Sequence, residues 1–249
     1  MKIAIISDIH EDILHLKAAL KNIEKHRVDQ IVCLGDISGY SVPYYNHLGT
    51  RNAHECLQLI RSNCAHVVLG NHDMHAAEII PEISPSFEYP DNWYQLAYQE
   101  RKKIASGKIW LHEENDIDPL YTREDIEYIR SLPQCVVLPC SMGNILFSHY
   151  AYPNLSGAGN TFFTYVDEFR KHFDFMRQKN CRLSFFGHTH TTGILKVMQK
   201  RINKYGFRKI AVISGDTAIS VPSIALNGKR NGFCIFNVKE WTLRSFRIY

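Results

Sequence analysis

The sequence lacks any apolar run of the roughly 18–20 residues that a membrane-spanning helix requires. Its opening residues, MKIAIIS, are too short for the hydrophobic region of a secretory signal. An excess of one charge is also missing: 29 Lys and Arg stand against 25 Asp and Glu, and the net charge of +4 does not by itself indicate a nucleic-acid or membrane partner. These absences favour a cytoplasmic protein with no membrane partner.

The sequence contains no CxxC pair and no even set of cysteines. Seven cysteines are scattered along the chain, in apolar stretches such as IVCLGD and GFCIFN. This pattern is typical of buried thiols in a reducing compartment and not of a disulfide framework.

Internal repeats and low-complexity tracts are absent, and the first seventy residues alternate between strand and helix patterns. Strands are predicted at 2–6, 29–36 and 66–70, with helices from Ile13, where apolar residues recur at helical spacing, and over 52–62. This alternation predicts an α/β core.

The middle of the chain has a different texture, with a proline-punctuated loop, PEISPSFEYP, followed by helical patterns at 91–106 and 122–132. The second half returns to strands joined by short turns, which favours mixed sheets. The predicted strands are 134–140, 142–149, 182–188, 194–200, 207–214, 232–238 and 242–248, with one helix at 161–179. We therefore predict one domain over residues 1–249, with a helical insertion at about 74–132.

Five short stretches place metal-type ligands just beyond the ends of predicted strands. They are SDIH (Asp8, His10), LGDISG (Asp36), LGNHD (Asn71, His72, Asp73), FSHY (His149) and FGHTH (His188, His190). Carboxyl ends of strands in α/β folds meet at one crevice, and side chains at i and i+2 of an extended segment point the same way. The glycines at 35, 70 and 187 precede ligands, as expected where the backbone turns tightly.

Each stretch alone has an ordinary structural explanation. DxH fits a helix cap with a surface histidine, GD fits a turn, and a lone His149 fits a core histidine. All five in this order predict a metal centre instead. Nitrogen and oxygen ligands without cysteine favour Mn, Fe, Zn, Co or Ni.

This ordered set resembles the pattern DxH, GDxxG, GNHD, H, GHxH of the calcineurin-like metallophosphoesterase superfamily. SDIHEDILHLKAAL and VCLGDISGY are similar to its small bacterial phosphoesterase and phosphodiesterase branch. The resemblance implies a four-layer α/β/β/α sandwich with two mixed β-sheets. It also implies a dinuclear phosphohydrolase that cleaves a phosphodiester or phosphomonoester by attack of a metal-bridging hydroxide.

The resemblance further implies a role for each site residue. Two divalent transition metal ions are expected, with Mn or Fe favoured. His72 would protonate the leaving group, and Asp73 would orient His72. The implied metal ligands are Asp8, His10 and His190 at one ion, Asn71, His149 and His188 at the other, and Asp36 between them.

Two departures from the family pattern bear on the substrate. GDISGYSV lacks the arginine of the protein phosphatases, and Pro222-Ser223 stands where the family has Pro-Arg, with Arg230 as a nearby substitute. The stretch Tyr40–His47 is also longer than the compact version. Its tyrosines either stack on an aromatic part of the substrate or pack the loop.

We expect a small phosphoester or nucleotide as the substrate. One alternative is a binding scaffold that kept the fold and lost the chemistry. Another is a nuclease that uses the basic strip 196–209, KVMQKRINKYGFRK, although nucleic acid is the less favoured partner. The oligomeric state stays open.

Overall fold

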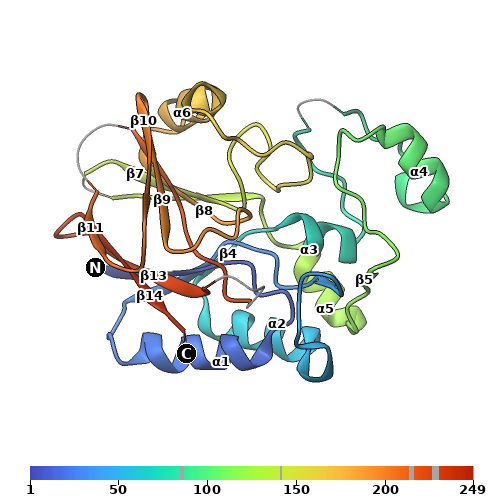
Figure 1. Cartoon of the computed structure of the whole chain (residues 1–249), viewed down its shortest axis with the longest axis horizontal. Helices are drawn as coiled ribbons and strands as arrows, with labels where there is room; N and C mark the ends of the chain where they lie inside the picture. The colour runs from blue at the N-terminus through green and yellow to red at the C-terminus, as the bar shows by residue number, and fades with distance from the viewer. Residues whose placement is uncertain (85–86, 141, 213–215, 226–229, 249) are drawn as a thin grey trace.

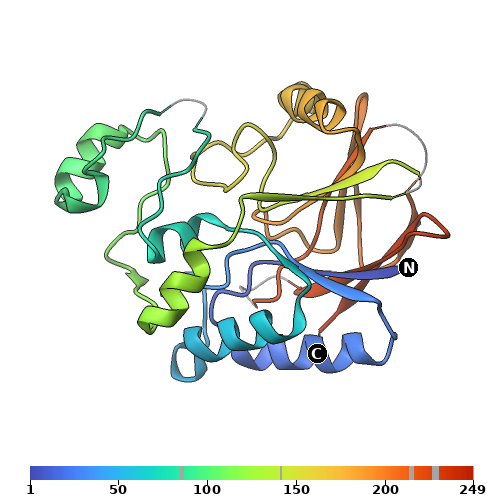
Figure 2. The same ribbon diagram turned by 180° about the vertical axis from the view of Figure 1, so that it is seen from behind.

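The computed structural model describes residues 1–84, 87–140, 142–212, 216–225 and 230–248. Two six-stranded sheets lie face to face, with helices on both outer sides (Figures 1 and 2). This is the predicted four-layer α/β/β/α sandwich with two mixed sheets.

The first sheet has the order β11-β14-β13-β1-β2-β4. Its centre is parallel from β1 to β2 to β4, and β13 joins β1 in the antiparallel sense. The strands are β1 (Lys2–Ile6), β2 (Gln30–Cys33), β4 (His66–Val67), β11 (Lys209–Ala211), β13 (Gly232–Asn237) and β14 (Thr242–Arg247).

The second sheet has the order β10-β9-β12-β8-β7-β6, in which β12, β8 and β7 run parallel. Its strands are β6 (Cys135–Leu138), β7 (Asn144–Ser148), β8 (Cys181–Phe186), β9 (Ile194–Met198), β10 (Arg201–Tyr205) and β12 (Thr217–Ser220). A separate pair, β3 (Tyr40–Ser41) with β5 (Asp116–Ile117), joins two distant loops.

Strand β1 explains why the layers stack, because its alternate side chains enter two different cores. Ile3 and Ile5 face the second sheet, in a core with Phe147 and Phe185. Ala4 and Ile6 belong to the core beneath the helices. A strand buried on both faces reads as a continuous apolar run, which is what KIAII is.

The α-helices cover the two outer faces. Four of them contribute to the core outside the first sheet, and α6 packs on the second sheet. The α-helices are α1 (Ile13–Glu24), α2 (Ala53–Asn63), α3 (Asn71–Ala76), α4 (Tyr98–Ala105), α5 (Arg123–Arg130) and α6 (Arg170–Gln178). Three 3₁₀ turns are η1 (Leu48–Thr50), η2 (Trp93–Gln95) and η3 (Val166–Phe169). None of the helices in the described part of the chain is long and apolar enough to span a membrane.

The helix predicted over 161–179 is wrong in its first part. Residues 161–165 are not helical, and a 3₁₀ turn from Val166 leads into α6. The backbone amides of Thr164 and Tyr165 donate to the Glu168 carboxylate, which begins the helix there. Strand β12 was not predicted, and the end of the predicted strand 207–214 lies outside the described residues.

The segment 74–132 divides into two kinds of structure. Met74 and Ile129, in α3 and α5 at its ends, belong to the main core beneath the helices. Residues 78–121 hold their own small core around Trp93, Ala105 and Ile109. We call residues 78–121 the side segment; its helix α4 lies apart from the sheets in Figure 1. That the whole chain acts as a single domain stays a prediction.

His172 is a fully buried histidine between α6 and β8. The Tyr152 backbone amide donates to its Nδ1 at 2.9 Å, and its Nε2 donates to the Ser184 hydroxyl at 3.0 Å. Both ring nitrogens are thus satisfied in the neutral form. Burial lowers the pKa of His172 to about 3.

We predict that His172 makes stability fall with acid. Below pH 6.5 His172 is protonated in the unfolded chain but stays neutral in the folded chain. Its contribution to the free energy of unfolding therefore falls by about 1.4 kcal/mol per pH unit. Replacing it in His172→Gln removes this titration and also weakens the buried hydrogen bonds. The wild-type free energy of unfolding in urea should therefore exceed that of His172→Gln by more at pH 7.5 than at pH 5.5. An equal difference at the two pH values contradicts the assignment.

Candidate metal centre

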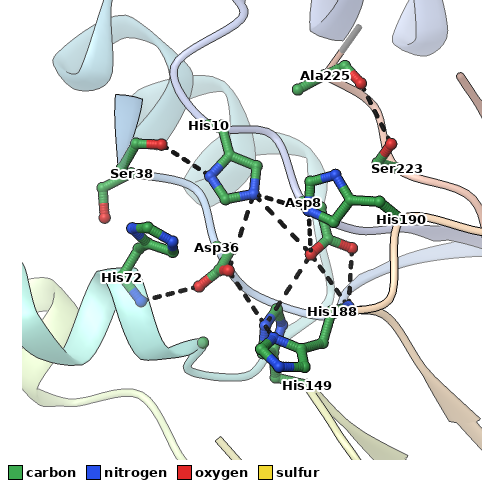
Figure 3. A network of polar contacts seen from close by, with 12 residues as sticks. Asp8, His10, Asp36, Ser38, His72, His149, His188, His190, Ser223 and Ala225 are labelled. Atoms are coloured by element: carbon green, nitrogen blue, oxygen red, sulfur yellow. Dashed lines mark hydrogen bonds and ion pairs between the residues drawn. The ribbon is translucent and has the colours of Figure 1, made fainter. Parts of the chain in front are cut away.

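The structure brings the predicted site residues together at the ends of strands in both sheets (Figure 3). One group follows the parallel strands of the first sheet, and the other follows β7 and β8 of the second. In chain order they are Asp8 and His10 after β1, Asp36 after β2, Asn71 to Asp73 at the start of α3, His149 after β7, and His188 and His190 after β8.

The backbone reaches this centre through left-handed turns. Positive φ angles occur at Asp8 (54°), His10 (45°), Asp36 (50°), His188 (62°) and His190 (46°). The expectation that paired ligands extend along a strand is therefore wrong. Each such residue costs about 1 kcal/mol or more, and strain of this kind gathers at functional sites.

Two glycines make the close packing of the turns feasible. A methyl group on Gly70 would collide with the Asp36 carboxylate, and one on Gly187 would collide with the Ser7 hydroxyl and the Asp8 carboxylate. The absence of a side chain lets these loops approach the site.

Asp8, His10 and His190 form one cluster. The Nε2 atom of His190 lies 3.4 Å from Asp8 Oδ1, and the Nε2 atoms of His10 and His190 lie 3.1 Å apart. Both oxygens of Asp8 also accept the backbone N–H of His188. These contacts hold the Asp8 carboxylate in one orientation.

Asp36, His149 and His188 form a second cluster. Asp36 Oδ2 lies 3.2 Å from His149 Nε2, and His149 Nε2 lies 3.2 Å from His188 Nδ1. The same oxygen is 3.8 Å from His10 Nε2. Asp36 therefore stands between the clusters. A methyl group on Gly157 would meet both His188 Nδ1 and Asn71 Oδ1, which places Asn71 beside the second cluster.

The donor set fits divalent cations because several lone pairs of the site residues face one another. Too few hydrogen atoms are present to pair them. The Nδ1 atoms of His10 and His149 donate to the carbonyls of Gly39 (2.8 Å) and Leu34 (2.7 Å), which leaves each Nε2 as a lone pair in the neutral ring. These lone pairs face carboxylates or other ring nitrogens. Asn71 Oδ1 and His188 Nε2 are buried without a hydrogen-bond partner among the described residues. Cations at the two clusters would satisfy these lone pairs and Asn71 Oδ1.

The pKa values show the same demand for positive charge. Burial acts to raise the pKa of Asp36, but His149 and its neighbours hold this pKa well below the usual range. Burial acts to lower the pKa of His149, yet the Asp36 carboxylate raises it to about 9. Without a metal, a proton on His149 would take the place of a cation.

His72 lies on α3 beside both clusters. Its backbone N–H donates to Asp36 Oδ1 at 3.0 Å, and its ring contacts Trp110 with centroids 4.3 Å apart. The ligand atoms of His10, Asp36 and His72 also lie close enough to hold an ion. The geometry thus admits His72 either as an acid or as a ligand. Burial lowers its pKa to about 3.

Among the described residues Asp73 makes no hydrogen bond to the His72 ring, and its role in orienting His72 stays a prediction. Its Oδ1 accepts from the backbone N–H groups of Ile37 and Ser38 and from the Ser38 hydroxyl, and its Oδ2 accepts from Gly70 N–H. Asp73 therefore ties the turn after Asp36 to the start of α3. It fixes the backbone from which His72 projects.

Aromatic residues that no motif revealed stand over three site histidines. Trp110 contacts His72, Phe162 stacks on His188 (4.9 Å, 7°), and Tyr45 stacks on His10 (5.0 Å, 29°). Trp110 and Phe162 come from segments with no metal-type pattern, so spacing alone could not find them.

Of the tyrosines in the 40–47 stretch, two pack the loop. Tyr40 and Tyr45 are buried, and the Tyr40 hydroxyl donates to the Tyr45 carbonyl at 2.7 Å. Tyr44 is 68% exposed and remains available to a ligand.

Sequence reasoning also missed an ion pair beneath the site. Glu11, buried and next to His10, pairs with Arg51 at 2.8 Å. Its other oxygen accepts the Gly39 N–H at 3.3 Å. The pair braces the turn whose carbonyl holds His10.

The sandwich with Asp and His clusters at its strand ends defines a metal-binding phosphoesterase fold. The family model described as calcineurin-like phosphoesterase matches residues 1–192. The chain belongs to this family of phosphoesterases, which generally bind divalent metals.

Individual proteins are similar to the chain in sequence or in fold. The chain is 27% identical over 254 residues to an uncharacterized protein of Methanocaldococcus jannaschii, covering 99% of this chain and 86% of that protein. A metallophosphoesterase from Sphaerobacter thermophilus superposes with a TM-score of 0.66 at 22% identity, over 100% of this chain and 88% of its own. A hypothetical protein from Pyrococcus horikoshii gives 0.59 at 13% identity, over 99% and 87%.

We predict that Gly187→Ala weakens metal binding, because the added methyl displaces the Asp8 carboxylate. Changes behind metal ligands typically cost about 10- to 100-fold in metal affinity. The measurement is metal content after equilibrium dialysis against graded free Mn²⁺. Gly49→Ala is the matched control, since a methyl there meets open space. Equal affinity in wild type and Gly187→Ala would show that the close packing at Asp8 is unimportant.

Proposed function

We propose that the protein is a dinuclear metal-dependent phosphohydrolase acting on a small phosphoester or nucleotide. The observation that carries the proposal is the position of Asp36. This buried carboxylate lies between an Asp8, His10, His190 cluster and a His149, His188 cluster that adjoins Asn71.

Two divalent ions held by these residues would neutralise the charge on a phosphoester and lower the pKa of a bound water. Asp8 and Asp36 supply the negative charge that retains them. The carbonyls of Gly39 and Leu34 keep His10 and His149 in the tautomer that offers Nε2. The resulting set of nitrogen and oxygen donors, without thiolate, fits Mn, Fe, Zn, Co or Ni, and among these we propose Mn or Fe as the bound ion.

The protein residue proposed to move a proton is His72. It stands on a helix fixed by Asp73 and faces the same space as the two clusters (Figure 3). Protonated, its ring would give a proton to the departing oxygen of the ester.

The surroundings of the centre support a small substrate. A cavity of about 440 Å³ adjoins Trp110 and includes the exposed Tyr44 in its wall. It also contains Ser41, Asn115 and Asn160, which offer hydrogen-bonding groups. This combination suits a nucleoside-sized organic group held by stacking and a few polar contacts.

The two alternatives receive less support. A scaffold without chemistry has no need for the complete set of converging donors. The basic strip forms the hairpin of β9 and β10. Its exposed tip, Lys200 and Arg201, is separated from Thr191 by the length of β9, about 16 Å for its five residues. That placement does not favour the strip as a substrate groove.

Asp36→Asn should abolish turnover, because it removes the charge between the two clusters. We expect a loss of at least about 100-fold in kcat/KM for bis-p-nitrophenyl phosphate in Mn²⁺. The assay compares this diester with p-nitrophenyl phosphate, before and after chelation. Wild-type rates in Asp36→Asn, or no metal-stimulated turnover on either ester, would refute the proposed function.

The variant His72→Ala distinguishes whether His72 acts as the general acid or as a metal ligand. If His72 is the acid, kcat falls by about 10²- to 10⁴-fold while metal content is retained, and the loss is greatest for esters with poor leaving groups. Rates over a series of substituted phenyl esters, together with metal content, provide the measurement. Loss of the metal, with the same rate loss for all leaving groups, would instead assign His72 as a ligand.

A further inference from the structure

A narrow cavity lies between Asn71, beside the second cluster, and the side segment. Its volume is about 30 Å³, enough for a small polar group but not for a nucleoside. We call it the Arg101 cavity. Its wall includes Asn71 of the second cluster, Trp110, His75, Tyr94, His112 and Arg101.

Arg101, on α4, is a cation without a counter-ion in the described part of the chain. Its Nε is buried and has no hydrogen-bond partner there. None of the ion pairs among the described residues involves Arg101. An unpartnered buried donor of a charged group is costly, so such a group is normally matched by an anion.

The wall of the cavity has no described carboxylate that could serve as this anion. Burial, His112 and Arg101 lower the pKa of His75 to about 3, so that ring is neutral. Outside the wall, Asp118 is 82% exposed and pairs with His112 at 3.3 Å, and Glu78 lies within electrostatic range of Tyr94. Arg101 therefore sets a positive field in the cavity.

His75, His112 and Asp118 do not form a second metal site, although their ligand atoms lie near one another. The two imidazoles are stacked at 4.3 Å with planes only 13° apart. Imidazole lone pairs lie in the ring plane, so two parallel rings cannot both direct them at one ion. The two rings therefore form part of the cavity surface and do not chelate an ion.

The cavity is connected to the site through two residues. Asn71 adjoins the second cluster, and Trp110 contacts the His72 ring while lining the cavity. The neighbouring 440 Å³ cavity also includes Trp110, but its wall carries two carboxylates, Glu113 and Asp116, against one cation, Lys102. Those carboxylates repel an anion, so the two sides of Trp110 differ in charge.

We propose that Arg101 binds a second anionic group of the substrate, a phosphate other than the one that is cleaved. This assignment rests on the proposed function and narrows its substrate class. The substrate is a phosphoester that carries a further phosphate, such as a nucleotide with two phosphate groups. Arg101 also supplies, from the side segment, a cation that Ser223 does not provide at the C-terminal segment.

The test uses two esters that differ by one phosphate. They are the p-nitrophenyl ester of thymidine 5′-phosphate and the same compound with an added 3′-phosphate. The scissile bond and the leaving group are identical. Wild type should prefer the bisphosphate by about tenfold in kcat/KM, the worth of one charge-assisted contact.

Three variants test whether Arg101 causes the preference for the bisphosphate. Arg101→Ala should reduce it to less than about threefold, mainly through KM, and Arg101→Lys should recover part of it. Lys103→Ala removes the same charge from an exposed position on the same helix and should keep the full preference. Thermal unfolding of each variant checks that α4 is intact.

The outcomes separate this inference from the proposed function. Turnover of both esters with no preference in wild type, or with the same preference in Arg101→Ala, overturns the role of Arg101 alone. Competition by inorganic pyrophosphate and inorganic phosphate, at fixed free Mn²⁺, gives a second measurement. Pyrophosphate should bind more tightly than phosphate only while Arg101 is present. Inactivity on both thymidine esters, with p-nitrophenyl phosphate still cleaved, also overturns the role of Arg101, whereas inactivity on every ester tested refutes the proposed function itself.

Discussion

Two buried carboxylates, Asp8 and Asp36, set the main constraint on this molecule. Both are almost completely withdrawn from water, which is expensive for a negative charge unless positive charge is close. Imidazoles surround them, but their protonation is opposed by the same burial. The site is consequently stable only as a unit of acids, bases and cations. The left-handed turns, the glycines without side chains and the Glu11–Arg51 brace all hold that unit in place.

Much of the fold followed from short apolar runs. KIAII and LSFF are buried on both faces, and their uniform hydrophobicity marks central strands of a layered α/β protein. Residues 161–165 were assigned wrongly because their aromatic side chains mimic a helical face. In the structure Phe162 instead lies on His188, and the helix begins where Glu168 caps it.

The candidate site could be predicted as a set of residues but not as a geometry. Polar residues after each strand identify the donors, since strand ends converge. Nothing in the spacing of His188 and His190 reveals that both adopt positive φ. The partners of Asp73 depend on a turn distant in sequence, and Trp110 reaches His72 only because the side segment folds back. Such contacts are fixed by tertiary packing, which local pattern does not encode.

The side segment is joined to the site loops by main-chain hydrogen bonds. The Trp110 N–H donates to the Ala158 carbonyl at 2.8 Å, and Ile109 pairs with Gly159. Trp93, Ala105 and Ile109 nevertheless form a core of their own, although Ile79, Ile83 and Tyr121 pack against the cores of the sandwich. Backbone hydrogen bonds persist when a side chain is replaced. Because the segment has a core of its own, most of the stability lost in such a replacement is lost within the segment. Side chains of this segment can therefore change during evolution while the metal-binding residues and the sheets of the sandwich are inherited unchanged.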